Sequence, residues 1–213
     1  MCGIIGVTSS SNVQDFIISS LKRLEYRGYD SSGLATIYEN KLNLCRAEGK
    51  INNLTSKLEE TPLEGSIGIG HTRWATHGNI SVDNAHPHVS GQVAIVHNGI
   101  IENYQKIKDE LIKRGRKFTS QTDSEVIAHL FDEEFTKNIP KKKATQNVIK
   151  ILKGAYAFVV LDLNEPDTLI AARNASPLAI GKGDILNSVG SDAIALAGIA
   201  KQIIFLEDGD FAI

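Results

Sequence analysis

Short apolar runs bounded by turn residues predict strands along most of the chain. We expect strands at 3–8, 34–38, 42–47, 67–71, 93–97, 156–161, 168–172, 178–180, 185–189 and 203–206, with a turn at Asn40-Lys41 between the second and third. The stretch Gly181-Lys182-Gly183-Asp184 has the glycines of a phosphate-binding loop. It lacks the strand–loop–helix context that such a loop needs, so we interpret it as a hairpin turn.

Helical spacing of apolar residues predicts helices between these strands. Asn12 is expected to cap a first helix, in which Phe16, Ile17 and Leu21 share one face and which ends before Gly28. Three further helices are expected at 103–114, at 122–135 and at 145–152. The second of these starts at Thr122-x-x-Glu125, which we interpret as a capping box.

The strands come in blocks and do not alternate one by one with helices. This order favours an α+β fold with largely antiparallel sheets and helices packed outside them. Residues 211–213 are apolar and follow the turn-like 208–210, so another strand begins where the sequence stops. We therefore expect the chain to be one domain of a longer protein.

Composition narrows the class of protein. The 213 residues are 42% hydrophobic and 23% charged, which is ordinary for a globular domain. A net charge of −2 gives no reason to expect nucleic acid or an anionic membrane as partner. Neither a signal peptide nor a membrane span is predicted. The only cysteines, Cys2 and Cys45, make neither a disulfide framework nor a metal-binding pair, so we expect a reducing, cytoplasmic location.

Cys2 is the first residue with candidate chemistry. Removal of Met1 would leave a thiol and a free α-amine on the same residue. A thiol is mostly protonated at neutral pH and is then a weak nucleophile, while a terminal amine is basic enough to take its proton. Position alone leaves a second interpretation equally open, in which Cys2 is a small buried residue at the start of a strand.

Three polar segments, at 27–33, 71–78 and 97–103, are dense in groups that bind or catalyse. The second holds an arginine and the only tryptophan, just past a predicted strand. In the third, the side-chain amide of Asn98 adjoins the backbone N–H of Gly99, and an oxyanion hole requires such a pair of donors. Each segment is also compatible with a simple turn, and for Asn98-Gly99 taken alone the turn is the favoured interpretation.

Five of the six histidines lie between His71 and His97, which raises the question of a zinc site. His86 and His88 could share a strand face, but no nearby acidic pair or second cysteine completes a set of ligands. No metal and no other cofactor is therefore expected.

Taken together, the motifs resemble those of the class II glutamine amidotransferases, which are N-terminal-nucleophile hydrolases. The segments that carry the resemblance occur in the family's order and spacing: Cys2-Gly3-Ile4, 24–31, 71–78, His86-Pro87-His88, 97–103 and 122–127. The resemblance covers essentially the whole chain. Its motif sequences resemble most those of the branch that aminates fructose 6-phosphate, because the purine-pathway branch has a different arginine loop and a tyrosine in place of Trp74.

The resemblance implies a four-layer α-β-β-α sandwich and a glutaminase domain spanning 1–213. It also implies a role for each site residue. Cys2 would be the nucleophile, Asn98 and Gly99 the oxyanion donors, and Arg27 a residue that orients the catalytic terminus. Glutamine would be bound by Arg73 at its α-carboxylate, by Asp123 at its α-ammonium, and by Thr76 and His77. Trp74 would be the gate between the glutaminase cleft and an ammonia channel.

L-glutamine is therefore the expected substrate. Family members of this branch continue into two C-terminal sugar-isomerase domains, which are missing here, and the full-length protein is expected to be a homodimer. Two alternatives stay open. One is another class II amidotransferase, such as the purine-pathway enzyme. The other is a binding or regulatory module without chemistry, which a retained Met1 would indicate, because a peptide nitrogen cannot act as the base.

Overall fold

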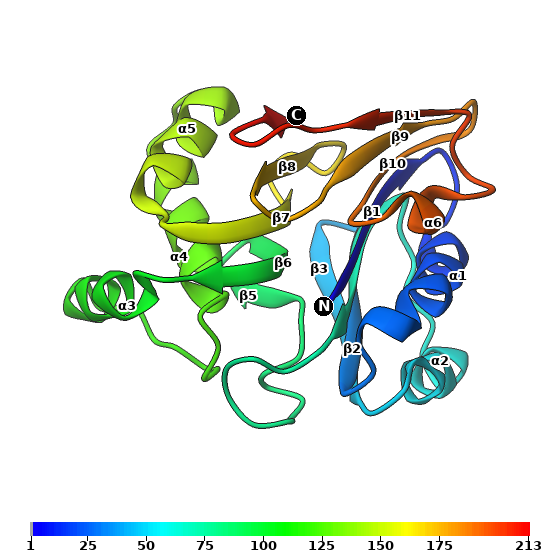
Figure 1. The fold of residues 1–213 in the computed structure, drawn as a ribbon, viewed down its shortest axis with the longest axis horizontal. Helices are drawn as coiled ribbons and strands as arrows, with labels where there is room; N and C mark the ends of the chain where they lie inside the picture. The colour runs from blue at the N-terminus through cyan, green and yellow to red at the C-terminus, as the bar shows by residue number, and fades with distance from the viewer. Residues whose placement is uncertain (1) are drawn as a thin grey trace.

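Two antiparallel β-sheets stack face to face in the computed structural model, and helices cover both outer faces (Figure 1). The structure describes residues 2–213, so Met1 and the question of its removal lie outside the described residues. Sheet A has seven strands in the order β11-β9-β10-β1-β4-β2-β3, and sheet B has five in the order β12-β8-β7-β6-β5. All pairings between these strands are antiparallel, as the sequence predicted.

The strands of sheet A are β1 (Gly3–Ser9), β2 (Ser31–Tyr38), β3 (Lys41–Glu48), β4 (Ile67–Arg73), β9 (Ala179–Lys182), β10 (Leu186–Gly190) and β11 (Gln202–Phe205). Those of sheet B are β5 (His88–Ser90), β6 (Val93–Ile101), β7 (Gly154–Asp162), β8 (Leu169–Asn174) and β12 (Phe211–Ala212). The helices are α1 (Gln14–Leu24), the 3₁₀ turn η1 (Glu25–Arg27), α2 (Ile51–Glu60), α3 (Tyr104–Lys113), α4 (Glu125–Phe135), α5 (Lys141–Ile151) and α6 (Ala193–Leu196).

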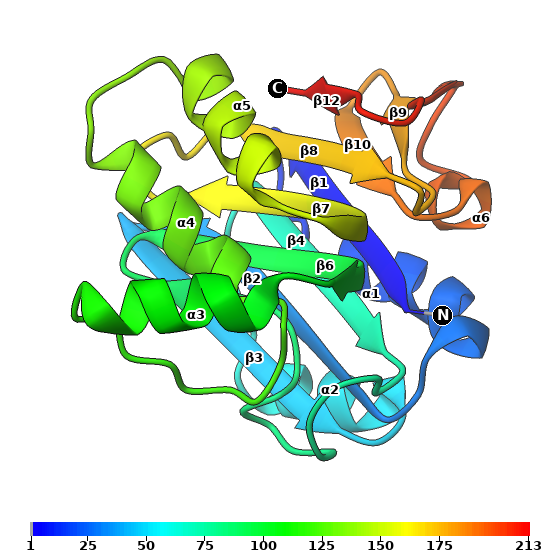
Figure 2. The same cartoon turned by 60° about the vertical axis from the view of Figure 1, so that its left-hand side comes forward.

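Three separate apolar cores hold the layers together. The central core lies between the sheets and contains Ile4 and Ile69 from sheet A with Val96 and Val159 from sheet B. An outer core joins α1, α2 and α6 to sheet A, and another joins α3, α4 and α5 to sheet B. Figure 2 shows α3, α4 and α5 in front of sheet B, with the long strands of sheet A behind it. The layers therefore run α-β-β-α, which confirms the predicted sandwich.

The position of β1 determines where Cys2 lies. β1 pairs with β4 on one side and with β10 on the other, so it is an interior strand of sheet A. The pairing with β4 begins at Gly3, opposite Thr72. A Cβ at Gly3 would come within 2.6 Å of Thr72 Oγ1 and 2.8 Å of Leu24 Cβ, so glycine lets α1 pack closely here. Cys2 is thus fixed by a strand that is held from both sides.

Most predicted elements are present, with shifted ends. The predicted strands all form, and 179–190 is an antiparallel hairpin of β9 and β10, as expected. The turn between β2 and β3 is at Glu39-Asn40, one residue earlier than predicted, because Tyr38 pairs with Lys41. Both turn residues have positive φ, as this tight hairpin requires. The predicted cap was one residue early: the cap position of α1 is Val13, and Asn12, the residue before it, accepts a hydrogen bond from the Gln14 N–H.

Some predictions were wrong or incomplete. Helix α2 was missed, although Ile51, Leu54 and Leu58 are buried at helical spacing. Strand β5 and the single turn α6 were also missed, and α5 begins at Lys141, four residues before the predicted start. The capping box was wrong, because the cap position of α4 is Ser124 and Thr122 instead contacts His88 and Ser120. No helix within residues 2–213 has both the length and the apolar character needed to cross a bilayer.

Candidate active site

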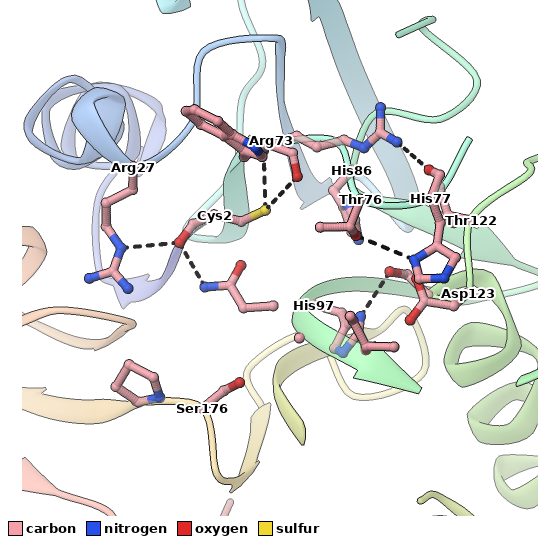
Figure 3. A pocket seen from close by; sticks show the side chains of 16 residues that line it. Cys2, Arg27, Arg73, Thr76, His77, His86, His97, Thr122, Asp123 and Ser176 are labelled. Carbon is pink, nitrogen blue, oxygen red and sulfur yellow. Dashed lines mark hydrogen bonds and ion pairs between the residues drawn. The ribbon is translucent and has the colours of Figure 1, made fainter. Parts of the chain in front are cut away.

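The Cys2 side chain opens into a cavity of about 220 Å³ between the two sheets. Its Sγ accepts a hydrogen bond from the Trp74 N–H at 3.2 Å and lies 3.5 Å from the Trp74 carbonyl (Figure 3). Burial raises the pKa of the Cys2 thiol, and the hydrogen bond from Trp74 opposes this only in part. The thiol is therefore mostly protonated at neutral pH, and any nucleophilic role requires a base beside it.

The amide of Asn98 lies next to Cys2. Its Nδ2 donates to the Cys2 carbonyl at 3.0 Å, while its Oδ1 lies 3.0 Å from His71 Nε2. Asn98 and Gly99 both lie inside strand β6, opposite Ala157 and Tyr156 of β7. The turn interpretation of Asn98-Gly99 is therefore wrong. Pairing with β7 decides the conformation of this segment, and local composition does not.

Gly99 is required by the geometry of this strand. Its φ is +121°, and a Cβ built here would lie 2.0 Å from the carbonyl oxygen of Ala155. Backbone of a paired strand cannot move aside as a flexible side chain can, so only glycine fits. Gly99 lines the cavity together with Asn98.

Arg27 contacts Cys2 from the side away from Arg73 and Asp123 (Figure 3). Its Nε donates to the Cys2 carbonyl at 3.2 Å, and its Nη1 donates to Asp192 at 2.7 Å. The same carboxylate oxygen accepts the hydroxyl of Tyr26 at 2.9 Å. Asp192 is 165 residues away from Arg27 in sequence, and no spacing pattern pointed to it.

Arg73 and Asp123 are the buried charged residues at the polar end of the cavity. The side chain of Arg73 is 3% exposed and that of Asp123 is 4% exposed. Arg73, the last residue of β4, donates to the carbonyls of His77 at 2.6 Å and Asn79 at 3.3 Å. Asp123 precedes α4 and accepts the Ile101 N–H at 2.7 Å. A cation and an anion thus line one small cavity, which suits a zwitterionic ligand.

The segment that follows β4 supplies the remaining predicted residues. Thr76 and His77 line the cavity, and His77 Nδ1 lies 3.4 Å from Thr76 Oγ1 and 3.9 Å from Asp123 Oδ1. The loop is held by Asp30, which accepts the Ala75 N–H. Trp74 also lines the cavity, yet it is 48% exposed and contacts Tyr29 edge to face at 5.4 Å. All nine residues predicted for the site therefore line one cavity: Cys2, Arg27, Arg73, Trp74, Thr76, His77, Asn98, Gly99 and Asp123.

Other lining residues were not predicted as part of the site. They are His86, His97, Ile100, Thr122, Ser124, Ser176 and Pro177. Ser176 and Pro177 come from a connection after β8 that carries no motif. Among residues 2–213, no group of three or more His, Cys, Asp or Glu side chains is arranged to hold a metal ion.

Comparison with known proteins identifies the family. The profile described as "Glutamine amidotransferase domain" matches residues 71–197. This chain belongs to the glutamine amidotransferase family.

Two relatives match this amidotransferase chain along its whole length. It is 52% identical to glutamine–fructose-6-phosphate aminotransferase (isomerizing) of Zymomonas mobilis and 53% identical to the enzyme of that name from Mesorhizobium japonicum. Each alignment covers 100% of this chain and 35% of the relative, so the chain spans about a third of each relative's length.

Solved structures share the amidotransferase fold. Glutamine phosphoribosylpyrophosphate amidotransferase from B. subtilis superposes with a TM-score of 0.84 at 27% identity, over 99% of this chain and 46% of that one. A glutamine aminotransferase class-II domain protein from Silicibacter pomeroyi has a TM-score of 0.65 at 16% identity, over 99% of this chain and 93% of that one, and shows likeness of fold alone. The predicted family and fold are confirmed.

Proposed function

We propose that this chain hydrolyses L-glutamine to glutamate and ammonia, with Cys2 as the nucleophile. The observation that carries the proposal is the arrangement of one thiol, one amide donor and two opposite charges around a single cavity. Asn98 donates to the backbone carbonyl of Cys2, the residue that carries the thiol. The charges of Arg73 and Asp123 suit the α-carboxylate and α-ammonium of an amino acid.

The chemistry follows from these groups once Met1 is removed. The Cys2 Sγ attacks the side-chain amide carbon of glutamine, and the α-amine of Cys2 takes the thiol proton. The amide oxygen becomes an oxyanion, which the Asn98 side chain and the Gly99 N–H stabilise. The carbon–nitrogen bond breaks, the nitrogen takes back the proton held by the Cys2 α-ammonium and leaves as ammonia, and a γ-glutamyl thioester remains. Water then attacks the thioester, which releases glutamate and restores the thiol.

Within a longer protein, we propose that the ammonia converts fructose 6-phosphate to glucosamine 6-phosphate. The support is the name and length of the two relatives, since this chain corresponds to only 35% of each. Residues 1–213 would then be the glutaminase domain, and C-terminal isomerase domains would bind the phosphosugar. The exposed Trp74 at the cavity is suited to gate ammonia passage toward them. A homodimeric full-length enzyme and a cytoplasmic location remain predictions.

The test measures glutamate release by purified protein whose N-terminus has been read by intact mass. Cys2→Ala should abolish release, and Cys2→Ser should nearly do so, because a hydroxyl is far harder to deprotonate than a thiol. Cys45→Ser is the matched control, since it removes the only other thiol. Undiminished release by Cys2→Ala, or full release by protein that retains Met1 uniformly, would refute the assignment.

A further inference from the structure

His71 lies behind the cavity wall, in contact with Asn98, and does not line the cavity itself. It is on β4, fully buried, and its ring nitrogen Nε2 lies 3.0 Å from both the carbonyl oxygen of His97 and the Oδ1 of Asn98. The other ring nitrogen, Nδ1, has no hydrogen-bond partner among the described residues. These contacts define the protonation state of the ring.

A backbone carbonyl can only accept a hydrogen bond, so the nitrogen that faces the His97 carbonyl must carry a proton. His71 is therefore the Nε2–H tautomer. Burial lowers the pKa of His71 to about 3, so at neutral pH the ring is uncharged and has only this one N–H. The ring of His86 contacts the His71 ring, with centroids 4.0 Å apart, and adds no acceptor to Nδ1.

The same reasoning applies to the other side of Asn98. The Cys2 carbonyl, 3.0 Å away, also only accepts, so the amide atom that faces it must be the nitrogen. The amide oxygen must then face His71, whose Nε2–H is already required by the His97 carbonyl. Two separate backbone carbonyls thus demand the same orientation of one amide.

We propose that His71 is a positioning residue that locks the side-chain amide of Asn98 with its nitrogen toward Cys2. In the opposite orientation, an oxygen lone pair would face the oxyanion that forms on the substrate and would repel it. The lock matters because the two orientations of an amide have almost the same shape, so packing alone does not choose between them. This inference adds a positioning residue to the proposed glutaminase function, and the kinetic test below rests on that function.

The first test does not depend on enzymatic activity. Two-bond proton–nitrogen NMR spectra of the ¹⁵N-labelled protein at neutral pH report which ring nitrogen of a histidine is protonated, and loss of a signal in His71→Gln assigns it. We expect His71 to be neutral and protonated at Nε2. Protonation at Nδ1 would overturn the proposal, because Nε2 would then accept from the Asn98 nitrogen and turn the amide oxygen toward Cys2.

The second test is a double-mutant cycle with glutamine as substrate. His71→Leu should lower kcat about 2- to 12-fold, the factor that one ordinary hydrogen bond is worth, with little change in KM. In an Asn98→Ala background the same change should cost almost nothing further, because the amide it orients is gone. His71→Gln, whose side-chain NH₂ can reach toward Oδ1, should recover part of the rate.

His88→Leu is the matched control for the loss of a buried imidazole. His88 is 1% exposed, and its Nε2 contacts Thr122 and not Asn98. The fold-decrease in kcat caused by His88→Leu should multiply with the fold-decrease caused by Asn98→Ala when the two changes are combined. The same full multiplication for His71→Leu and Asn98→Ala, in protein that circular dichroism shows to be folded, would refute the positioning role. The glutaminase function would still stand. If wild type with a free Cys2 releases no glutamate yet shows the Nε2–H tautomer, the function fails and the orienting contact stands.

Discussion

Replacing Asp123 with asparagine separates its charge from its structural contact. Asp123 Oδ2 accepts the Ile101 N–H at 2.7 Å, and the amide oxygen of asparagine can accept the same bond. Asp123→Asn should therefore keep the link between β6 and the segment before α4 while removing the negative charge. Asp123→Ala removes both, so the pair of variants distinguishes loss of charge from loss of structure.

The expected effect follows from burial. The Asp123 side chain is 4% exposed, and Nδ1 of the His77 ring lies 3.9 Å from its Oδ1. A substrate ammonium paired with such a carboxylate is largely desolvated, and losing one partner of a pair of this kind costs about 2–5 kcal/mol. This corresponds to a loss of roughly 30- to 5,000-fold in kcat/KM.

The assay compares glutamine with its des-amino analogue, which lacks the α-ammonium. Wild type should prefer glutamine by the factor above, and Asp123→Asn should lose most of that preference, because the discriminating charge is gone. The corresponding pair is Arg73→Ala with the des-carboxy analogue. Arg73 also holds two loop carbonyls, so a general loss of activity is expected there as well.

A different outcome would remove Asp123 from the site. Asp123 lies two residues before the first residue of α4, and a carboxylate near a helix start stabilises the helix by about 0.3–1 kcal/mol. If that were its only role, Asp123→Asn would lower the free energy of unfolding slightly and leave the preference between the two substrates unchanged. That result would refute the ammonium assignment.

Three further predictions follow from the fold. Gly99→Ala should lower the free energy of unfolding, measured by urea titration, by about 1–3 kcal/mol or more. The reason is that Gly99 has a positive φ and an added Cβ would clash with the Ala155 carbonyl. An unchanged urea midpoint would contradict this. Burial would raise the pKa of Glu125, but the His129 ring 3.6 Å away and hydrogen bonds from Ser120 and Thr119 outweigh it and lower the pKa to about 2. The stabilisation by this carboxylate is therefore complete above its ordinary pKa of 4.5 and is lost as pH falls toward 2, so Glu125→Gln should be less stable than wild type by about 1–3 kcal/mol at pH 7 and by much less near pH 2. Cys45→Ser should keep full glutaminase activity, since burial raises the pKa of this thiol and it packs against the outer core of sheet A; loss of activity in a folded variant would show that this prediction is wrong.

The sequence predicted the elements better than the contacts between them. Strands and most helices follow from local patterns, and even the missed α2 has its apolar residues at helical spacing, without a side-chain cap to mark its start. Glu125 shows the limit of local rules. Its spacing from Thr122 suggested a capping box, but its carboxylate accepts the backbone N–H groups of Thr119 and Ser120 and so shapes the loop before the helix.

The site residues came from family resemblance, and their supports could not have come from spacing. Asn98-Gly99 has the local composition of a turn, yet β7 keeps it in a strand. Asp192 reaches Arg27 across 165 residues, and His71 reaches Asn98 across 27. Such contacts depend on which strands become neighbours in the sheet, and that is a property of the whole fold.

The interior position of β1 has a consequence for how this protein loses activity. Chain termini usually fray first, at little cost in free energy. Here the residues that follow Cys2 are hydrogen-bonded to strands on both sides, and Ile4 and Ile5 are fully buried. Cys2, the proposed nucleophile, should therefore leave its position only when sheet A opens as a whole. Amide exchange at Ile4 and Ile5 should then be as slow as global unfolding, and heat inactivation should coincide with loss of the fold.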